Sequence, residues 1–402
     1  MSSINFMEKL LDGVEVEWKA LGDVTSLRRG RVMSKEYLAD NAGDYPVYSS
    51  QTANNGEIGS IDTFDFDGEY ISWTTDGANA GTVFYRKGKF SVTNVCGLIS
   101  INDEKKINYK FLFYWLTTQA QKHVYSGMGN PKLMSHQVEK IPTPIPCPEN
   151  PKKSLEIQAE IVRILDAFTE LTTELTTELT TELTTRKKQY NYYRDQLLSF
   201  EEGEVEWKTL GEVANFSNGK GHEKDIVEGG KYIVVNSKFI STDGKVSKYS
   251  DNQLCPLFVD DILIVMSDLP NGKALSKTFI VDKDEKYTLN QRIGAISAKN
   301  KGALLPKFLH YFLNRTPQLT KYDNGADQTN LRKDQILGIQ IPTIPIEEQK
   351  RRVAILEKFD ALTNSITEGL PREIELRQKQ YEYYRDLLLR FPKPETMSTP
   401  NV

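Results

Sequence analysis

The clearest hydrophobic pattern in the chain is a leucine at every fourth position of the sequence LTTELTTELTTELTT, residues 171–185. On an α-helix a step of four residues advances ~6 Å along the axis and ~40° around it, so this stripe of leucines winds slowly around the helix. The pattern favours a helix over residues 154–199, which spans ~70 Å if it is continuous. We interpret this helix as a spacer.

A second helix is predicted over residues 346–390, at an offset of 191 residues from the first. The offset keeps the apolar step of four, because it carries Leu171, Leu175, Leu179 and Leu183 onto Leu362, Ile366, Leu370 and Ile374. Threonine is a poor helix former, so neither helix is expected to be stable alone. The matched stripes predict that the two helices pack on each other; the alternative is that each stripe packs on its own neighbouring domain. Gly369 and Pro371 are expected to kink or interrupt the second helix.

Two blocks, residues 20–146 and 204–345, show short β-branched and aromatic runs between Gly, Asn, Asp and Ser turn signals. Such runs are typical of mixed, mostly β domains. The predicted elements are strands at 70–73, 82–85, 232–235 and 262–265, one amphipathic helix each at 109–116 and 306–313, and a closing Pro-rich extended segment each at 141–146 and 341–345.

The chain is a tandem duplication. EVEWKALGDV at residues 15–24 recurs as EVEWKTLGEV at 204–213, and RKKQYNYYRDQLL at 186–198 recurs as RQKQYEYYRDLLL at 377–389. Self-similarity of this kind indicates repeated architecture. We therefore expect an N-terminal segment that joins the helical region, two β domains, two helical spacers and a flexible tail, at residues 1–19, 20–146, 147–203, 204–345, 346–392 and 393–402.

The expected fold class is α+β, with two mixed, mostly β domains separated by two long antiparallel helices. The sequence before the second EVEW repeat resembles the sequence at the end of the last helix, LLLRF at residues 387–391. One half could therefore begin where the other ends. This similarity predicts that the two termini lie near one another, in a pseudo-two-fold, circular arrangement.

Composition narrows the class of protein. The chain has 402 residues, 39% of them hydrophobic and 26% charged, so it can form several folded cores. Its net charge of −4 does not indicate nucleic-acid binding, which would have to rest on local basic patches. Three scattered cysteines fit a reduced cytosol, and no apolar run predicts secretion or a membrane span. We expect a cytoplasmic protein.

Motifs for catalysis are missing from the sequence. It contains no GxxxxGK[ST] phosphate loop, no NPPY or DPPY adenine-methylation motif, and no HExxH or CxxC metal spacing. Its four histidines are dispersed, and none belongs to an evident triad. The expectation is a protein with no catalytic residues, no metal site and no cofactor of its own.

At this point the chain resembles the specificity subunit of type I restriction-modification systems, most closely the subgroup with tetrapeptide repeats in the central helix. The resemblance covers essentially the whole chain and rests on EVEWKxLG, on the repeats ending in Glu-Leu, on KQYxYYRDxLL and on the segment SITEGLPREIEL at residues 365–376. The family typically has Ala in the second place of the tetrapeptide, where this chain has Thr.

The resemblance implies a function. The two β domains would be target-recognition domains that each read half of a split, asymmetric sequence in double-stranded DNA. The helices would set the unread gap and dock two modification (adenine-methyltransferase) subunits, which use S-adenosylmethionine. Separate motor-nuclease restriction subunits would cut the DNA with ATP and Mg²⁺. The alternative is a non-enzymatic coiled-coil scaffold that carries two ligand-binding β domains and no DNA.

If the domains read DNA, their polar and basic loops are the candidates for contact with phosphates and base edges. The candidates in the first domain are Arg28, Arg29, Arg31, Ser49, Ser50, Gln51, Thr75, Asn79, Arg86, Lys87, Lys89, Asn130 and Lys132. Those in the second are Asn218, Lys220, His222, Asn236, Lys238, Asn271, Lys273, Asn290, Gln291, Arg292, Gln328, Asn330, Arg332 and Lys333.

The tyrosine-rich repeats are interpreted differently, because they are nearly identical in the two halves whereas readers of different half-sites should differ. We expect them to serve helix packing and contacts with the two modification subunits. The residues concerned are Tyr190, Tyr192, Tyr193 and Arg194, with Tyr381, Tyr383, Tyr384 and Arg385 in the second copy.

Overall fold

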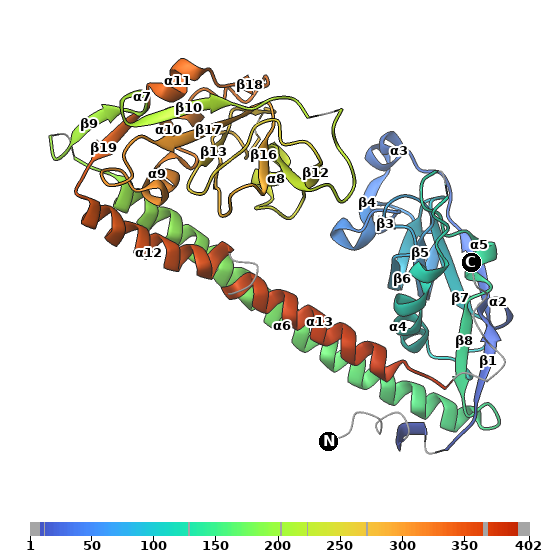
Figure 1. The fold of residues 1–402 in the computed structure, drawn as a ribbon. Coiled ribbons are helices and arrows are strands. Elements are labelled where there is room, and N and C mark those ends of the chain that lie inside the picture. Colours follow the sequence, from blue (N-terminus) through green and yellow to red (C-terminus); the bar gives the residue numbers. More distant parts are fainter. Residues whose placement is uncertain are drawn as a thin grey trace. The chain divides into compact units, whose positions relative to one another are not determined.

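The computed structural model describes residues 9–392 apart from 12, 128, 202, 223, 271 and 365–368. Its contacts divide the chain into two units: unit 1 combines Met1–Glu178 with Ile374–Val402, and unit 2 is Leu179–Glu373. Each unit holds one sheet-rich domain and two helix segments (Figure 1). One segment comes from α6 (Pro151–Leu198) and the other from α12 (Ile346–Asn364) or α13 (Gly369–Leu388). The mixed helix and sheet class is confirmed.

Domain 1, the sheet-rich part of unit 1, holds the predicted strands and helix. Its elements are β1 (Val16–Ala20), α2 (Leu21–Val24), β2 (Thr25–Arg29), α3 (Lys35–Asp40), β3 (Ala42–Tyr48), η1 (Ala53–Gly56), β4 (Glu57–Ile61), β5 (Phe66–Thr74), β6 (Val83–Val92), β7 (Cys96–Ile101), α4 (Tyr109–Gln119), η2 (Ala120–His123), α5 (Ser135–Val138) and β8 (Pro142–Pro146).

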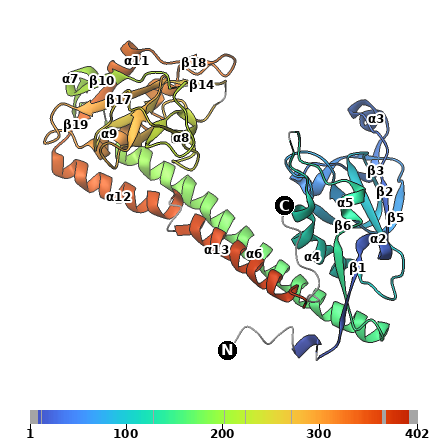
Figure 2. The same ribbon diagram turned by 45° about the vertical axis from the view of Figure 1, so that its right-hand side comes forward.

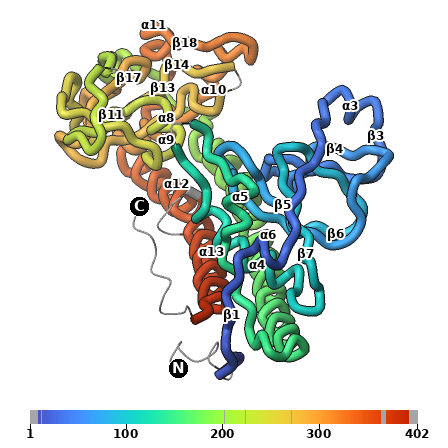
Figure 3. Tube along the Cα trace, turned by 90° about the vertical axis from the view of Figure 1, so that its right-hand side faces the viewer, coloured from blue at the N-terminus to red at the C-terminus, as the bar shows by residue number. Residues whose placement is uncertain are grey.

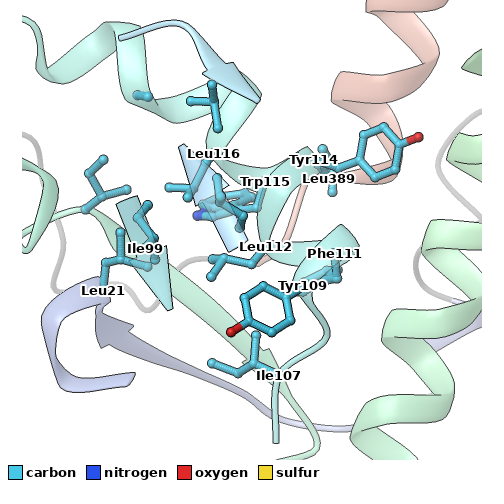
Figure 4. Packing of buried hydrophobic residues seen from close by; sticks show 14 of the residues in the cluster. Leu21, Ile99, Ile107, Tyr109, Phe111, Leu112, Tyr114, Trp115, Leu116 and Leu389 are labelled. Atoms are coloured by element: carbon cyan, nitrogen blue, oxygen red, sulfur yellow. The ribbon is translucent and has the colours of Figure 1, made fainter. Parts of the chain in front are cut away.

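A six-stranded sheet organises domain 1, in the order β2-β7-β5-β6-β3-β4. Strand β3 runs parallel to β6, and the other neighbours are antiparallel. Helix α4 begins after Asn108, whose side chain accepts hydrogen bonds from two backbone N–H groups of the first turn. Its Leu112 and Trp115 are buried against Ile99 of β7, in one core (Figure 4). Burying such a side chain contributes roughly 1.5–3 kcal/mol.

Domain 2, the sheet-rich part of unit 2, is built from β9 (Glu206–Thr209), α7 (Leu210–Val213), β10 (Ala214–Asn218), β11 (Tyr232–Val235), α8 (Ser237–Ser241), β12 (Lys248–Ser250), β13 (Ile262–Val265), β14 (Ser267–Asp268), β15 (Thr278–Ile280), β16 (Tyr287–Leu289), β17 (Ile293–Ala298), α9 (Pro306–Leu313), α10 (Pro317–Thr320), β18 (Thr329–Asn330), α11 (Lys333–Leu337) and β19 (Gln340–Thr343).

Domain 2 has two main sheets, β10-β17-β13-β15 and β12-β11-β16. Because successive side chains of a strand point to opposite faces, β13 serves two cores. Ile262 and Ile264 pack in the core that contains α9, whereas Leu263 and Val265 pack in the core that contains β11 and β16. Strand β11 runs parallel to β16. This parallel pair is the counterpart of β3 and β6 in domain 1.

A two-stranded antiparallel ribbon lies before the helices in both domains. It consists of β1 with β8 in domain 1 and of β9 with β19 in domain 2. These ribbons hold the Pro-punctuated segments predicted from the sequence. Proline is tolerated here because both strands of a two-stranded ribbon are edge strands. A proline that lacks an N–H therefore need not interrupt the hydrogen bonds of a central strand.

The helix segments pair antiparallel in each unit (Figure 1, Figure 2). In unit 1, Phe168 stacks on Tyr384 with ring centroids 5.5 Å apart, and Thr169 shares a hydrogen bond with Tyr381. In unit 2, Tyr193 stacks on Phe359 at 5.6 Å. The two stacks are copies of each other, because the offset of 191 carries Phe168 onto Phe359 and Tyr193 onto Tyr384.

The predicted leucine stripe is not a continuous seam between helices. Leu171 is 60% exposed and Leu362 is 52% exposed. The ~40° drift of each four-residue step turns these positions away from the contact. The remaining positions that the structure describes are half-buried: Leu175, Leu179, Leu183, Leu370 and Ile374. Ile366 lies outside the described residues.

The second helix is interrupted where the sequence predicted. Helix α12 ends at Asn364 and α13 begins at Gly369, which has a φ of 73°. A Cβ at Gly369 would lie 2.7 Å from the Leu362 carbonyl oxygen. Pro371 lies in the first turn of α13, where its missing N–H has no helical partner to lose.

The described residues nearest the two termini meet within unit 1. Leu11 shares the domain 1 core with Leu388, Leu389 and Phe391. The Trp18 indole N–H of β1 donates to the Pro392 carbonyl at 2.9 Å, just beyond the end of α13. Figure 3 shows β1 beside the end of α13. Residues 1–8 and the predicted tail 393–402 lie outside the described residues. Among the helices that the structure describes, none is long and apolar enough to cross a membrane.

Candidate nucleic-acid interface

Three chain segments meet beyond the ends of equivalent strands in the two domains. They follow β2, β3 and β6 in domain 1, and β10, β11 and β16 in domain 2. Because β3 and β6 are parallel, as are β11 and β16, the carboxyl ends of each pair meet at one edge. We call these residues rim 1 (Arg31, Ser49–Gln51 and residues 93–95) and rim 2 (Lys220, Asn236–Lys238 and residues 290–292).

Each rim depends on a glycine in close contact with the neighbouring backbone. A Cβ at Gly30 would lie 1.7 Å from the Val92 carbonyl oxygen, and one at Gly219 would lie 2.0 Å from the Asn290 carbonyl oxygen. The next residue then pairs in parallel across the gap, Arg31 with Thr93 and Lys220 with Asn290. The duplicated chain therefore places one cation at the same point of both rims.

Rim 2 forms a polar pocket of about 290 Å³ lined by Asn236, Ser237, Lys238, Asn290, Gln291 and Arg292. The Asn236 side-chain oxygen caps α8 by accepting from the Phe239 N–H at 2.9 Å. The Asn290 side-chain oxygen accepts from the Gln291 N–H at 2.9 Å and from the His222 N–H at 3.3 Å. Both oxygens are occupied, whereas the two amide NH₂ groups donate to no residue that the structure describes and are available to a ligand.

Rim 2 also carries unneutralised positive charge. Lys220, Lys238 and Arg292 are exposed and make no ion pair with any residue that the structure describes. Arg292 adopts a φ of 71°, a left-handed conformation uncommon for a side chain of this size. Cations bind DNA phosphates, and amide groups hydrogen-bond base edges, so both kinds of contact are possible at rim 2.

Rim 1 has a different chemistry at the same place. The Ser49 and Thr93 hydroxyls share a hydrogen bond of 2.8 Å. Arg31 donates to Asp65 at 3.0 Å and to the Tyr37 hydroxyl at 3.0 Å. The hydrogen bond to Tyr37, followed by the contacts with Asp65, raises the pKa of Arg31. Rim 1 therefore presents hydroxyls, the exposed Gln51 and a cation already held in place.

A second pair of loops adjoins each rim. In domain 1, the backbone of Lys132 pairs with that of Asp76 in an antiparallel β-bridge, beside the exposed Asn130. In domain 2, β18 pairs with β14, so that Asn330 lies opposite Ser267. The Gln328 amide donates to the Ser267 hydroxyl at 2.8 Å. Equivalent backbone bonds join loop to rim, from Thr75 N–H to Val95 and from Met266 N–H to Arg292.

The remaining predicted residues are more scattered. Arg28 and Arg29 are exposed on β2, and Asn218 is exposed at the end of β10. Asn79, Lys273 and Lys333 are exposed in neighbouring loops or at a helix start, and Arg332 pairs with Asp334 at 3.3 Å. Asn271 lies outside the described residues.

Three predicted contact residues are buried, so these predictions are wrong for the described structure. Arg86 is 2% exposed, because it points into the sheet and lies over the Tyr48 ring at 3.6 Å. Burial lowers the pKa of its guanidinium. Thr75 is buried and donates to the Val95 carbonyl at 3.0 Å. His222 is buried with both ring nitrogens engaged, by the Lys220 carbonyl and by the Thr288 hydroxyl.

Lys87 and Lys89 are not part of rim 1. Lys87 pairs with Glu69 at 2.8 Å. Glu69 hydrogen-bonds Tyr85, which packs on Phe113 of α4, so Lys87 belongs to the side of the sheet that faces the helices. Lys89 lies over the Phe64 ring at 4.7 Å.

The repeated tyrosines divide into buried and exposed positions. Tyr190 is only 7% exposed and belongs to the domain 2 core, so it cannot be the surface contact that was predicted. Burial raises its pKa to about 12. Tyr193 and Tyr384 are committed to the interhelical stacks. The most exposed members are Tyr192 and Tyr383, and nearby Arg194 and Arg385 each bind the adjacent aspartate at 2.7 Å.

Sequence reasoning missed Thr93 and Asn94 of rim 1. They lie in a short turn without the basic or Gly-rich composition that marked the other loops. The usable signal was their equivalence to Asn290 and Gln291, which becomes visible only once β7 is matched to β17. No group of three or more potential metal ligands occurs in the part of the chain that the structure describes.

The glycine contacts generate a prediction. Gly30→Ala and Gly219→Ala force a methyl group into a backbone carbonyl, so each should lower the unfolding free energy of its own unit by about 1–3 kcal/mol, as overpacking does. Urea unfolding followed by fluorescence measures the midpoint. Gly129→Ala and Gly211→Ala are matched controls, because a Cβ there meets no atom closer than 3.5 Å. Equal midpoints for test and control variants would contradict the described rims.

Comparison with known proteins agrees with this architecture. A family model described as the type I restriction modification DNA specificity domain matches residues 13–185 and 202–376. The chain is 39% identical to the type I restriction enzyme EcoR124I/EcoR124II specificity subunit of Escherichia coli, over 99% of this chain and 100% of that protein. It is 35% identical to a putative type I restriction enzyme specificity subunit of Haemophilus influenzae, over 96% and 98%.

A solved structure shows the same fold. It belongs to work on complex assembly and conformational transition of the type I R-M system, and its matching chain has a TM-score of 0.56 at 14% identity, over 94% of this chain and 98% of that one. The family match occurs twice and leaves out little more than the junction between the copies and the two ends. This chain therefore belongs to the type I restriction-modification DNA specificity family.

Proposed function

We propose that this chain directs a type I restriction-modification complex to a split, asymmetric sequence in double-stranded DNA, with each rim reading one half-site. The observation that carries the proposal is the repeated rim: the same three strand ends, the same glycine contact and the same cation position occur in both domains, while the surrounding side chains differ. A repeated frame with different side chains is what two readers of different sequences require.

Rim 2 has the groups for reading base edges. An arginine can donate two parallel hydrogen bonds to guanine, and asparagine or glutamine can bond adenine in a bidentate manner. Arg292, Asn290 and Gln291 are consecutive at this edge, and Asn236 lies across the pocket from them. Lys220 and Lys238 add charge suited to phosphates, which accept half to two-thirds of protein–DNA hydrogen bonds.

Rim 1 would read its half-site through smaller groups. Ser49 and Ser50 supply hydroxyls, and Gln51 and Asn94 supply amides, whereas Thr93 is buried and holds the Ser49 hydroxyl in place. Hydroxyls discriminate less between bases than bidentate side chains do. The two half-sites should therefore differ in sequence, and the bipartite target should be asymmetric.

The chain would act without catalysis of its own. Two adenine-methyltransferase subunits would dock on the repeated helix surfaces that carry Tyr192 and Tyr383, each exposed at the same place in its copy. Those subunits would bring S-adenosylmethionine, and motor-nuclease restriction subunits would use ATP and Mg²⁺. The two docking surfaces are the same in both copies, whereas the two rims differ. This arrangement suits one kind of methyltransferase acting at two different half-sites. The complex would work in the cytoplasm, where the DNA is.

The proposal is tested by expressing the chain with its methyltransferase in a host without adenine methylation, followed by single-molecule methylome sequencing. One split motif with a fixed gap and one methylated adenine in each half is expected. An active methyltransferase that yields no split motif would contradict the proposal. Omitting this chain is the control and should abolish the motif.

The charges of rim 2 make a separate prediction. Lys220→Met and Lys238→Met should each weaken DNA binding and flatten the plot of log Kobs against log salt concentration by about 0.9, because each phosphate contact releases condensed counterions. Filter binding of the methyltransferase complex at several salt concentrations measures the slope.

Two controls accompany these variants. Lys283→Met removes an exposed cation from the turn before the amino end of β16, at the opposite end of the strand from the rim. Arg86→Met removes the buried guanidinium. Neither should change the slope. A slope that falls equally in control and rim variants would show that the charge effect is not specific to the rim.

A further inference from the structure

Each helical segment sends one buried glutamine into the turn that leads to the domain's own helix. Gln158 of α6 is 0% exposed and Gln349 of α12 is 1% exposed. We propose that these two glutamines are positioning residues that fix each recognition domain in one pose on its helix, and thereby restrict the complex to one gap length. This inference rests on the proposed function.

In unit 1, the Gln158 amide bonds the turn before α4 on both sides. Its oxygen accepts from the Asn108 N–H at 2.8 Å, and its nitrogen donates to the Lys106 carbonyl at 2.8 Å. The nitrogen also donates to the Ser154 hydroxyl at 3.1 Å, one turn earlier in α6. Both the oxygen and the nitrogen of the amide are hydrogen-bonded to the turn. The amide therefore cannot rotate without losing these bonds.

In unit 2, Gln349 makes the same contact with the turn before α9. Its oxygen accepts from the Leu305 N–H at 2.8 Å, and its nitrogen donates to the Ala303 carbonyl at 2.8 Å. A further bond to the Ile344 carbonyl at 2.9 Å holds the side chain in place. In both units the amide bonds the residues one and three positions before the helix begins. We call each arrangement a glutamine clamp.

An ion pair accompanies each clamp. Lys110 of α4 binds Asp166 of α6 at 2.6 Å, and Lys307 of α9 binds Glu357 of α12 at 2.5 Å. These pairs are largely exposed and contribute little. The clamp differs because its groups are buried, where an unpaired N–H or C=O is strongly destabilising. The amide is therefore the directional part of the attachment.

The clamp is constant although the domains differ in length. The helix residues are related by 191 positions, Gln158 to Gln349, whereas the turn residues are related by 197, Lys106 to Ala303 and Asn108 to Leu305. The stretch from turn to glutamine is thus six residues shorter in unit 2 than in unit 1, and the same clamp forms in both. Two domains with different rims keep the same attachment, so the attachment serves something other than base reading.

Binding a split target with a fixed gap requires each recognition domain to keep a fixed orientation on its helix. One added base pair in the gap moves a half-site by ~3.4 Å along the duplex and turns it by ~35° around the axis. Apolar contacts such as those of Leu112 and Ile161 are non-directional and would tolerate some rotation of the domain. A buried amide with three fixed partners would not. Without the clamp, a domain could turn to reach a half-site one base pair out of place.

The test uses the whole complex with its methyltransferase and duplexes that carry the motif with the correct gap or with one base pair more or fewer. Gln158→Leu and Gln349→Leu are compared with wild type and with Gln189→Leu, a change at an exposed position of α6. The measured quantity is the ratio of Kd values for wrong-gap and correct-gap duplexes, with the base preferences of both half-sites read in parallel.

We expect the ratio to fall about tenfold in each clamp variant, the change produced by losing roughly 1.4 kcal/mol of orientation energy. The half-site preferences should stay unchanged, and Gln189→Leu should match wild type. A merely stabilising glutamine would weaken correct-gap and wrong-gap binding alike and leave the ratio constant, which would overturn the proposal.

Variants that retain an amide distinguish a loss of positioning from misfolding. Gln158→Asn and Gln349→Asn keep the polar group but shorten its reach by one methylene, so the loss of gap discrimination should recur in a folded chain. Discrimination equal to wild type in folded Asn variants would overturn the proposal. A wild-type complex that shows no preferred gap would instead contradict the proposed function itself, so the two failures are distinguishable.

Discussion

The antiparallel contact between α6 and the returning α12 and α13 is held in each unit by one tyrosine–phenylalanine stack. Helix α6 needs such contacts, because its threonine-rich middle favours helix weakly and several threonine hydroxyls, such as Thr184 and Thr185, bond back to the carbonyl four residues earlier. Packing therefore has to supply what propensity does not. Both stacks are copies of one contact, so the duplication provides the same support twice. The rims and the glutamine clamps lie on domains whose positions depend on that support.

The duplication separates what must be equal from what must differ. Helix stacks, glutamine clamps and the glycine contacts at Gly30 and Gly219 are the same in both copies. The side chains at the ends of β3 and β6 differ from those at the ends of β11 and β16. A backbone frame fixed by steric contact tolerates such variation, because exposed loop residues carry little of the packing energy. The rim side chains can therefore differ without changing the fold.

Much of the architecture could be predicted from the sequence, because repeats and periodicity are visible in one dimension. The interruption at Gly369 and Pro371 and the strands at 70–73 and 262–265 followed from local signals. The burial of Arg86 did not, because its neighbours Lys87 and Lys89 point to an exposed basic hairpin. Alternation along β6 puts Arg86 inside, a fact that depends on which face of the sheet is covered. The parallel pairing that gathers the rims joins segments some 40 residues apart or more and leaves no local pattern.

In the proposed function, each rim reads its own half-site within a shared frame. The most direct measurement is the methylated motif of a complex whose chain carries Asn290→Thr, Gln291→Asn and Arg292→Val, the residues found at the equivalent positions 93–95 of rim 1. We expect bases of the second half-site to change while the first half-site and the gap stay the same. An unchanged motif from an active complex, or a change in the first half-site, would contradict it.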